Sequence, residues 1–306
     1  MNEALRERLE EYLKNSSKSQ TTLAREIGIS GTALSQYLSG KYPTPGSIEP
    51  KIEEFFSLKE KADTVTKAPD YAETSISTEV YNTIAYCHVN RCIGAVIGDA
   101  GIGKTKGALK YAGDYSEVIY ITASKACKSQ KNMYRMIARK LRLNENRNIL
   151  DLYYDIRSKL DGSNKLLIID ETQHLSLTTI DDIRFFNDQS DETDLPPVGI
   201  VLIGNNELRT KMMGRYEQSL AQLFNRIQIQ RLMSTSHVLI EDIKKLFPVF
   251  VEKGAEKEIK FLHGIATSRW GVRGAVKVFL NSSNNGDVSL SGLAAIAKYM
   301  GIGLCA

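Results

Sequence analysis

The sequence predicts an α/β protein in which a central domain with a mostly parallel β-sheet lies between two smaller, all-helical domains. At 306 residues, the chain is too long for one ordinary domain and suits two or three. In its middle part, short apolar runs alternate with segments of helical periodicity, a pattern typical of a parallel sheet covered by helices. The apolar runs span residues 92–97, 118–122, 166–169 and 198–203.

The composition is that of a globular protein in water, with 42% hydrophobic and 25% charged residues. No stretch approaches the roughly 20 apolar residues of a membrane helix, and no apolar signal segment opens the chain. We therefore expect a cytoplasmic protein with no membrane partner. None of the cysteines shows a C-x-x-C spacing, so we expect neither disulfides nor zinc. They are Cys87, Cys92, Cys127 and Cys305.

The net charge of +4 hides a strong segregation of charge along the chain. Residues 123–147 carry eight basic residues against one acid, and residues 209–285 carry thirteen against six. Between them, residues 151–194 carry four basic residues against eleven acids. This arrangement suits a chain that holds both a metal–nucleotide site and surfaces for a polyanion.

The N-terminal residues 1–58 predict a small helical domain, and the polar residues 59–76 predict a linker. Leucines at positions 5, 9 and 13 form the stripe of an amphipathic helix. Two helical runs in residues 20–40 are separated by Gly28, which suits a tight turn, and Ser30 is placed to cap the second run. Residues 48–58 predict a further helix.

Residues 20–40 resemble the helix-turn-helix of phage repressors. In that arrangement Ala24 allows the two helices to cross, while Ile29 and Leu34 pack inward. The exposed face of the second helix then carries the candidate DNA contacts Thr32, Ser35 and Gln36. Residues 1–60 contain eight basic and nine acidic residues, whereas DNA-binding domains are normally basic. A protein-docking role for this domain therefore stays open.

The predicted central domain covers residues 77–230, and the predicted helical C-terminal domain covers residues 231–306. In the central domain, helices are expected between the apolar runs, and the C-terminal domain is expected to contain helices from near residue 236 to residue 299. The central helices are expected at residues 104–112, 129–143, 148–160 and 178–190.

An eight-residue segment after the first apolar run matches the phosphate-binding pattern G-x-x-x-x-G-K-[ST]. Its glycines let backbone N–H groups close around phosphates at a helix N-terminus. Lys104 can reach the β- and γ-phosphates, and the Thr105 hydroxyl can hold Mg²⁺. We expect ATP and Mg²⁺ as cofactors, because the position between strand and helix argues against a chance glycine-rich turn. The segment is Gly98, Asp99, Ala100, Gly101, Ile102, Gly103, Lys104 and Thr105.

Two carboxylates, Asp170 and Glu171, follow the third apolar run directly. The carboxyl ends of parallel strands are where ligands bind in open α/β sheets. We expect Asp170 to coordinate Mg²⁺ together with Thr105, and Glu171 to act as general base toward the attacking water. His174, three residues further on, is expected to be a structural histidine, with a catalytic role as the alternative.

The order of these motifs resembles the AAA+ ATPases, which implies a P-loop NTPase core followed by a helical lid. The resemblance assigns Asn205, at the end of the fourth run, to the sensor that orients water; an ordinary Asn-Asn turn is the alternative. It assigns Arg226, in LFNRI, to the arginine finger that enters a neighbouring subunit's site. Arg273, in GVRGAV, would be a second sensor that contacts phosphate in cis. For either arginine, a surface salt bridge is the alternative.

The basic segment 123–147 predicts a helix with cations along one face and apolar residues such as Met133 and Ile137 along another. No compensating acids are interleaved, so a track for the DNA backbone is at least as good an interpretation as a solvated charged face. The affinity of such contacts would depend strongly on salt and only weakly on the base sequence of the DNA. The candidate residues are Lys128, Lys131, Arg135, Arg139 and Arg142.

As a whole, the chain resembles the family of phage Mu B transposition proteins, through GDAGIGKT, LLIIDETQHL, VLIGNN and LFNRI between a repressor-like domain and a helical C-terminal domain. The resemblance implies an ATPase that forms helical filaments on non-specific double-stranded DNA and delivers that DNA to a transposase, which stimulates hydrolysis. Two alternatives stay open. One is a helix-turn-helix transcription regulator with an ATPase switch, and the other is a helicase-loader type of AAA+ protein.

Overall fold

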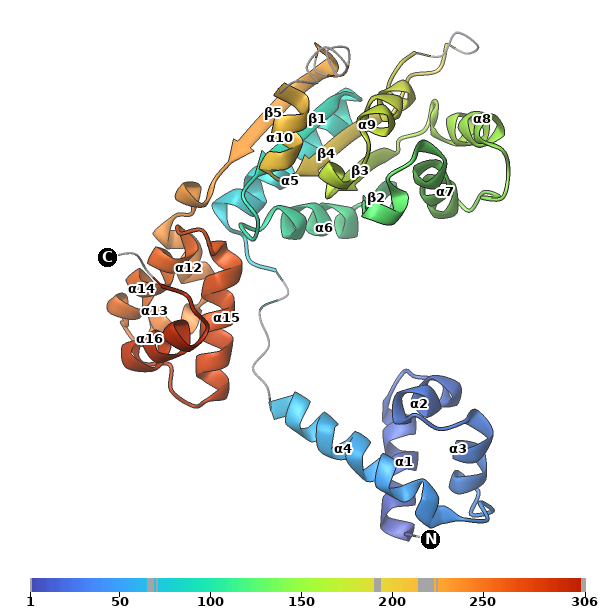
Figure 1. Ribbon diagram of the computed structural model, residues 1–306, viewed down its shortest axis with the longest axis vertical. Helices are drawn as coiled ribbons and strands as arrows, with labels where there is room; N and C mark the ends of the chain where they lie inside the picture. Colours follow the sequence, from blue (N-terminus) through green and yellow to red (C-terminus); the bar gives the residue numbers. More distant parts are fainter. Residues whose placement is uncertain are drawn as a thin grey trace. The chain divides into compact units, whose positions relative to one another are not determined.

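The computed structural model describes residues 2–64, 69, 71–189, 194–213, 223 and 225–303. The chain divides into two compact units, Met1–Lys67 and Ala68–Ala306, which are treated one at a time (Figure 1).

The first unit is a bundle of helices around a small apolar core that includes Leu9, Leu23 and Leu34. Side chains cap the first turns: the side-chain oxygen Oδ1 of Asn2 accepts from the backbone N–H of Leu5, and the Ser19 and Ser30 hydroxyls accept in the same way at the next two helices. The elements are α1 (Glu3–Asn15), α2 (Gln20–Ile27), α3 (Gly31–Leu38), a 3-10 turn η1 (Pro45–Ser47) and α4 (Glu49–Thr64).

Helices α2 and α3 have the predicted turn between them. Gly28 ends α2 with a φ of +77°, a left-handed conformation that favours glycine. Ala24 and Leu34 are buried, and Ile29 is half-buried. Thr32, Ser35 and Gln36 are exposed, as an outward-facing surface of α3 requires. Helix α4 continues to Thr64, so the expected end of this helix at residue 58 is wrong.

Five strands of the described chain form the sheet of the second unit, in the order β2-β3-β4-β1-β5. Every neighbouring pair is parallel, which confirms the predicted α/β class. The strands are β1 (Ile93–Gly98), β2 (Val118–Thr122), β3 (Leu166–Asp170), β4 (Gly199–Gly204) and β5 (Ile227–Met233).

Strand β5 was not predicted, because it does not have the composition of a buried strand. It lies at one edge of the sheet and alternates isoleucine with glutamine before Arg231 and the half-exposed Leu232. Polar and charged residues are common on edge strands, where they oppose pairing with other chains. The interior strands β1, β3 and β4 are buried throughout and so appear as continuous apolar runs.

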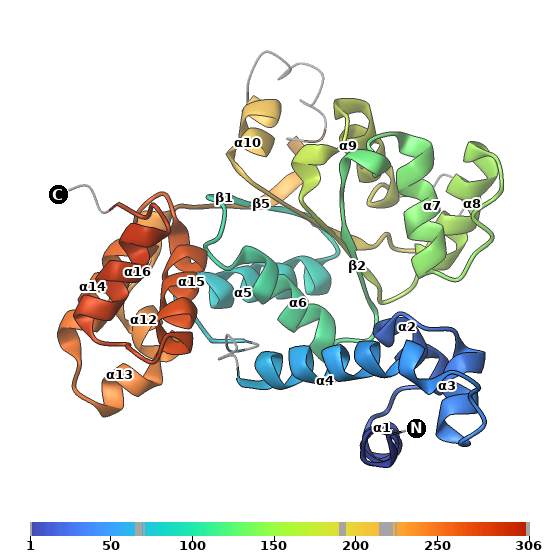
Figure 2. The ribbon, with the colours of Figure 1, turned by 60° about the horizontal axis from the view of Figure 1, so that its bottom comes forward.

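Helices cover both faces of the sheet, which gives three layers (Figures 1 and 2). Alternate strand residues point to opposite layers: Val96 packs with α5 and α6, whereas Ile97 packs with the helices of the other face. Helices α5 and α6 lie on the first face, and α7 to α10 on the second. Their bounds are α5 (Ser75–Asn90), α6 (Lys104–Asp114), α7 (Gln130–Lys140), α8 (Ile149–Leu160), α9 (Leu177–Ile183) and α10 (Asn206–Met213).

Four 3-10 turns complete the connections of the second unit: η2 (Lys125–Cys127), η3 (Thr172–His174), η4 (Arg184–Phe186) and η5 (Thr235–His237). The last of these leads into a helical bundle, here called the lid, which shares one apolar core with α5 and α6. The lid helices are α12 (Ile240–Leu246), α13 (Pro248–Glu252), α14 (Glu256–Ala266), α15 (Gly271–Asn284) and α16 (Leu290–Tyr299).

Within the described ranges, none of the helices combines the length and the apolar character needed to cross a lipid bilayer. Cys87, Cys92 and Cys127 are buried free thiols. Burial raises the pKa of both Cys87 and Cys92. Cys305 lies outside the described residues.

Helix α6 packs against α5 through Gly107, and this contact yields a test of the fold. A Cβ at Gly107 would lie 2.6 Å from the carbonyl oxygen of Ser77 and 3.0 Å from Cβ of Val80. We expect Gly107→Ala to lower the free energy of unfolding by about 1–3 kcal/mol, because the two helices must separate. Gly113→Ala, in the same helix, meets nothing within 4 Å and should raise stability by about 0.5–1 kcal/mol. Urea denaturation of both variants measures the difference, and equal effects would contradict the close packing.

Candidate active site

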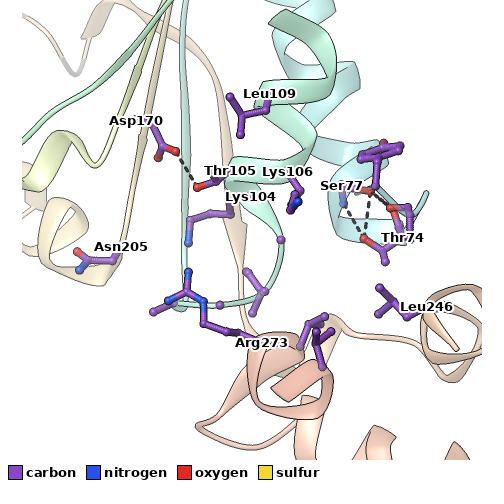
Figure 3. Close-up of a pocket in the computed structure, with 18 of the residues that line it drawn as sticks. Thr74, Ser77, Lys104, Thr105, Lys106, Leu109, Asp170, Asn205, Leu246 and Arg273 are labelled. Atoms are coloured by element: carbon purple, nitrogen blue, oxygen red, sulfur yellow. Dashed lines mark hydrogen bonds between the residues drawn. The ribbon is translucent and has the colours of Figure 1, made fainter. Parts of the chain in front are cut away.

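A cavity of about 480 Å³ lies at the carboxyl ends of β1, β3 and β4 (Figure 3). Four parts of the second unit line it. These are residues 100–105 of the predicted phosphate-binding segment, the strand ends with Asp170, Glu171 and Asn205, the segment before α5, and the lid. The sequence-predicted nucleotide residues are thus brought together in one place.

The segment 98–105 forms a tight loop between β1 and the N-terminus of α6. Gly101 and Gly103 have φ angles of +77° and +110°, which only glycine adopts without strain. At the start of the loop, a Cβ on Gly98 would lie 2.2 Å from the carbonyl oxygen of Met233. The loop therefore presents backbone N–H groups, rather than side chains, at a helix N-terminus, an arrangement suited to phosphate.

Lys104 is buried at the first position of α6, with 9% of its surface exposed. Its Nζ donates to the carbonyl oxygens of Gly98 at 2.9 Å and Asp99 at 2.7 Å. Burial lowers the pKa of Lys104, and the nearby Asp170 and Glu171 partly offset this effect. A buried ammonium group gains from an anionic ligand, so this position favours a bound phosphate.

Asp170 is 2% exposed and uses both carboxylate oxygens. Oδ2 accepts from the hydroxyls of Thr105 and Tyr120, each at 2.7 Å. Oδ1 accepts from the backbone N–H of Glu171 at 2.8 Å. A threonine hydroxyl beside an aspartate carboxylate is an oxygen donor set that fits Mg²⁺, and the metal-binding roles of Thr105 and Asp170 stay predictions.

Tyr120 is a site residue that sequence reasoning missed. It lies on β2, which pairs in parallel with β3 so that Thr122 is opposite Asp170. Tyr120, two residues before Thr122, reaches the Asp170 carboxylate with its hydroxyl. Burial, together with the charge of Asp170, raises the pKa of Tyr120. No local motif marks this tyrosine, because its position follows from strand pairing between segments 50 residues apart.

Glu171 lies on the cavity wall, in a left-handed conformation with a φ of +57°. Its Oε2 accepts a hydrogen bond from the side-chain amide of Gln173. Asn205 also lines the cavity, while its Oδ1 accepts from the backbone N–H of Glu207 at 2.9 Å at the start of α10. His174 is half-buried and is not among the described residues that line the cavity.

The lid contributes part of the cavity lining, including Arg273. At the start of α15, the backbone N–H of Arg273 donates to the carbonyl oxygen of Gly101 at 2.9 Å. Gly271 has a φ of +62°, and a Cβ there would lie 3.0 Å from the carbonyl oxygen of Ala100. Figure 3 shows the side chains of Arg273 and Lys104 converging on the same part of the cavity. The lid thus brings a second cation toward the place suited to phosphate.

The segment before α5 is attached to the lid by a buried carboxylate. Asp242 of α12 is 2% exposed and accepts from the backbone N–H and the hydroxyl of Ser75, each at 2.6 Å. Lys245 donates to the carbonyl oxygen of Glu73 at 2.8 Å. This end of the cavity is apolar, in contrast to the phosphate loop. Its lining includes Tyr71, Ala72, Leu109, Leu246, Val272 and Val276. A cavity with a cationic end and an apolar end fits a nucleotide.

An AAA domain family matches residues 88–212. The Mu-like prophage FluMu DNA transposition protein B of Haemophilus influenzae is 30% identical over 225 residues, which cover 72% of this chain and 76% of that protein. The chain belongs to the Mu B family of transposition proteins. The ATP-dependent target DNA activator B of Escherichia phage Mu is 24% identical over 272 residues, which cover 88% of this chain and 84% of that protein.

The fold of the second unit is also found in a solved structure. The crystal structure of Cdc6p from Pyrobaculum aerophilum superposes with a TM-score of 0.57 at 12% identity, over 78% of this chain and 70% of that chain. The P-loop NTPase core with a helical lid, expected from the sequence, is thus confirmed as the fold of the second unit.

Arg226 does not reach the cavity of its own chain. It directly precedes β5, whose first residue pairs with Ile93 and whose last residue pairs with Gly98. A whole strand, about 20 Å at a rise of about 3.3 Å per residue, therefore separates Arg226 from the phosphate loop. Its side chain is 49% exposed and pairs with Asp188. An action on a neighbouring subunit stays a prediction.

The basic stripe of this Mu B family member is only partly helical. Lys131, Arg135 and Arg139 follow steps of four along α7, but the helix ends at Lys140, not at residue 143 as predicted. Lys128 and Arg142 therefore lie outside the helix. All of these side chains are exposed except Arg135, which is half-buried.

The one acid counted with the basic segment, Glu145, lies beside the stripe. Glu145 follows the end of α7 and folds back onto it, where its carboxylate accepts from Nε of Arg139 at 3.0 Å and from the terminal guanidinium nitrogen at 2.6 Å. Its carbonyl oxygen accepts from Arg135 at 3.2 Å. Glu145 thus offsets part of the positive charge at the C-terminal end of α7, and the DNA track stays a prediction.

The attachment of the lid by Asp242 yields a second test. We expect Asp242→Asn to lower nucleotide affinity and to cost about 1.5–3 kcal/mol of stability, because a buried, charge-assisted set of hydrogen bonds is lost. The affinity change would occur although Asp242 does not line the cavity, since the segment at Thr74 and Ser75 would lose its attachment. Glu241→Gln, at the exposed neighbouring position, is the matched control. Titration with a fluorescent ATP analogue and thermal unfolding measure both effects; unchanged affinity would contradict the coupling.

Proposed function

We propose that this chain is a Mg²⁺-dependent ATPase that binds double-stranded DNA, with little base preference, and activates that DNA as a target for a transposase. The observation that carries the proposal is the relationship to the ATP-dependent target DNA activator B of phage Mu, which extends over 88% of this chain. The cavity supports it, because its residues have the chemistry required for ATP hydrolysis.

In this proposal, ATP hydrolysis depends on residues from three strand ends and the lid. The loop N–H groups and Lys104 bind the β- and γ-phosphates, and Arg273 adds a cation from the lid. Thr105 and Asp170 would hold Mg²⁺, which supplies charge neutralisation on the phosphate oxygens when bound. Glu171 takes the proton of the attacking water, and Asn205 orients that water.

Oligomers are part of the proposal because Arg226 cannot complete its own site. An exposed arginine about a strand's length from the phosphate loop can act only in the cavity of a second copy. Repetition of this head-to-tail contact generates a helical assembly unless it closes into a ring. Binding of such an assembly to duplex DNA would place many weak phosphate contacts side by side.

Two surfaces are proposed to contact DNA. The stripe formed by Lys128, Lys131, Arg135, Arg139 and Arg142 suits the phosphate backbone, with Glu145 reducing the contribution of Arg139. In the first unit, Thr32, Ser35 and Gln36 are the exposed residues of α3 that can reach base edges. A DNA substrate of this kind implies a cytoplasmic location.

The proposal is tested with duplex DNA of arbitrary sequence in ATP, in ADP and without nucleotide. We expect filaments by electron microscopy only with ATP. Lys104→Ala should abolish ATP-dependent DNA binding, because the phosphate contacts are lost. Glu171→Gln should keep DNA binding and lower the hydrolysis rate by about 10²–10⁴-fold, because only the general base is removed.

Three outcomes would count against this function. Absence of ATP-dependent binding at modest salt would exclude it. Normal turnover by Glu171→Gln would refute the role of that carboxylate. Sequence-specific binding that survives deletion of residues 77–306 would instead indicate a transcription regulator.

Mixing experiments test Arg226. We expect Arg226→Ala alone to lose about 10³-fold in hydrolysis and Lys104→Ala alone to be inactive. In an equal mixture, about one interface in four combines an intact cavity with an intact arginine, so part of the activity should return. Lack of recovery in mixtures that still assemble would show that Arg226 does not act in trans.

A further inference from the structure

Gln173, on the turn η3 just after β3, lies behind the cavity wall with 3% of its surface exposed. Both ends of its side-chain amide are used. Nε2 donates to Oε2 of Glu171, and Oε1 accepts from the backbone N–H of Asn205 at 3.3 Å. One buried amide therefore joins the two strand ends that carry the proposed general base and the proposed sensor.

The orientation of this amide follows from its partners. The N–H of Asn205 can only donate, so the oxygen of the amide must face it. The NH₂ group then faces Glu171 and donates to Oε2 of its carboxyl group. This hydrogen bond fixes the direction in which that carboxyl group points.

The surroundings hold the Gln173 residue in place. Its carbonyl oxygen accepts from Nζ of Lys211, which also donates to the carbonyl oxygen of Leu175 at 3.3 Å. On the β4 side, a Cβ on Gly204 would lie 3.0 Å from Oε1 of Gln173 and 2.6 Å from Leu208. The absence of a side chain at Gly204 is what lets the amide approach the backbone of Asn205.

We propose that Gln173 is a positioning residue, which holds the carboxylate of Glu171 in place for water activation and couples it to the loop of Asn205. This inference rests on the proposed ATPase function. A displacement of the Asn205 loop would move the amide, and the amide would move the carboxylate. Gln173 does not line the cavity, so its loss should leave ATP binding intact.

The most informative variant is Gln173→Glu, which keeps the length and the acceptor for Asn205 but replaces the donor with an oxygen. Two acceptor oxygens then face each other, so the carboxylate of Glu171 loses its hydrogen-bond donor and is repelled. We expect kcat for ATP hydrolysis to fall at least about tenfold at neutral pH, with the dissociation constant of a fluorescent ATP analogue within about twofold of wild type. A merely structural loss would weaken binding of the ATP analogue as well as lower kcat, whereas loss of positioning lowers kcat alone.

Two further variants keep the inference testable if Gln173→Glu does not fold. Gln173→Met preserves the length and removes both hydrogen bonds, so kcat should fall while the ATP analogue still binds. His174→Gln changes the next residue of the same turn and should hydrolyse ATP at the wild-type rate. A wild-type or increased kcat in either folded Gln173 variant would overturn the inference, as would a loss of activity in His174→Gln equal to that in Gln173→Met.

Glu171→Gln, measured beside them, distinguishes failure of the Gln173 proposal from failure of the proposed ATPase function. Normal hydrolysis by that variant would refute the proposed chemistry of the site as a whole. If Glu171→Gln is inactive while Gln173→Glu keeps the wild-type rate, only the role of Gln173 is refuted.

Discussion

Close backbone contacts around the phosphate loop, at glycines where no side chain fits, constrain the rest of the second unit. The end of β5 lies so close to Gly98 that a Cβ there would be 2.2 Å from the carbonyl oxygen of Met233, and the start of α15 meets Ala100 and Gly101 in the same way through Gly271. Sheet, loop and lid therefore share one junction in which side chains have no room. Because the junction is made of backbone, the cations Lys104 and Arg273 are free to face the cavity.

How far the sequence predicts this site depends on whether the signal is local. Gly98–Thr105 and the pair Asp170–Glu171 are contiguous motifs at strand ends, and the structure places both on the cavity. Tyr120 and Asp242 carry no local signal, since their partners lie on segments joined only by folding. Gln173 was overlooked although it adjoins His174, because a buried amide is recognised by its two partners and not by its neighbours in sequence.

Strand β5 and helix α5 are not predicted from the sequence, and each has a physical explanation. Strand β5 is an edge strand with a mixed composition, and helix α5 is rich in serine, threonine, asparagine and β-branched residues, which are weak helix formers. Packing against α6 and the sheet, rather than propensity, stabilises α5. The sequence predicts the excess of basic residues in 123–147 but not their pairing. In the fold Glu145 pairs with Arg139, which lowers the positive charge available to a DNA backbone at that point.

Strand β5 also has a mechanical consequence. Its last residue touches the phosphate loop, where the backbone N–H of Asp99 donates to the carbonyl oxygen of Met233, and Arg226 precedes its first residue. In the proposed assembly, this stiff strand would connect the nucleotide site of one subunit to Arg226, the residue that acts in the next. The strands of successive copies would then all point the same way, so the row would have a direction: one terminal subunit would lack an incoming arginine, and the other would offer one that no site receives.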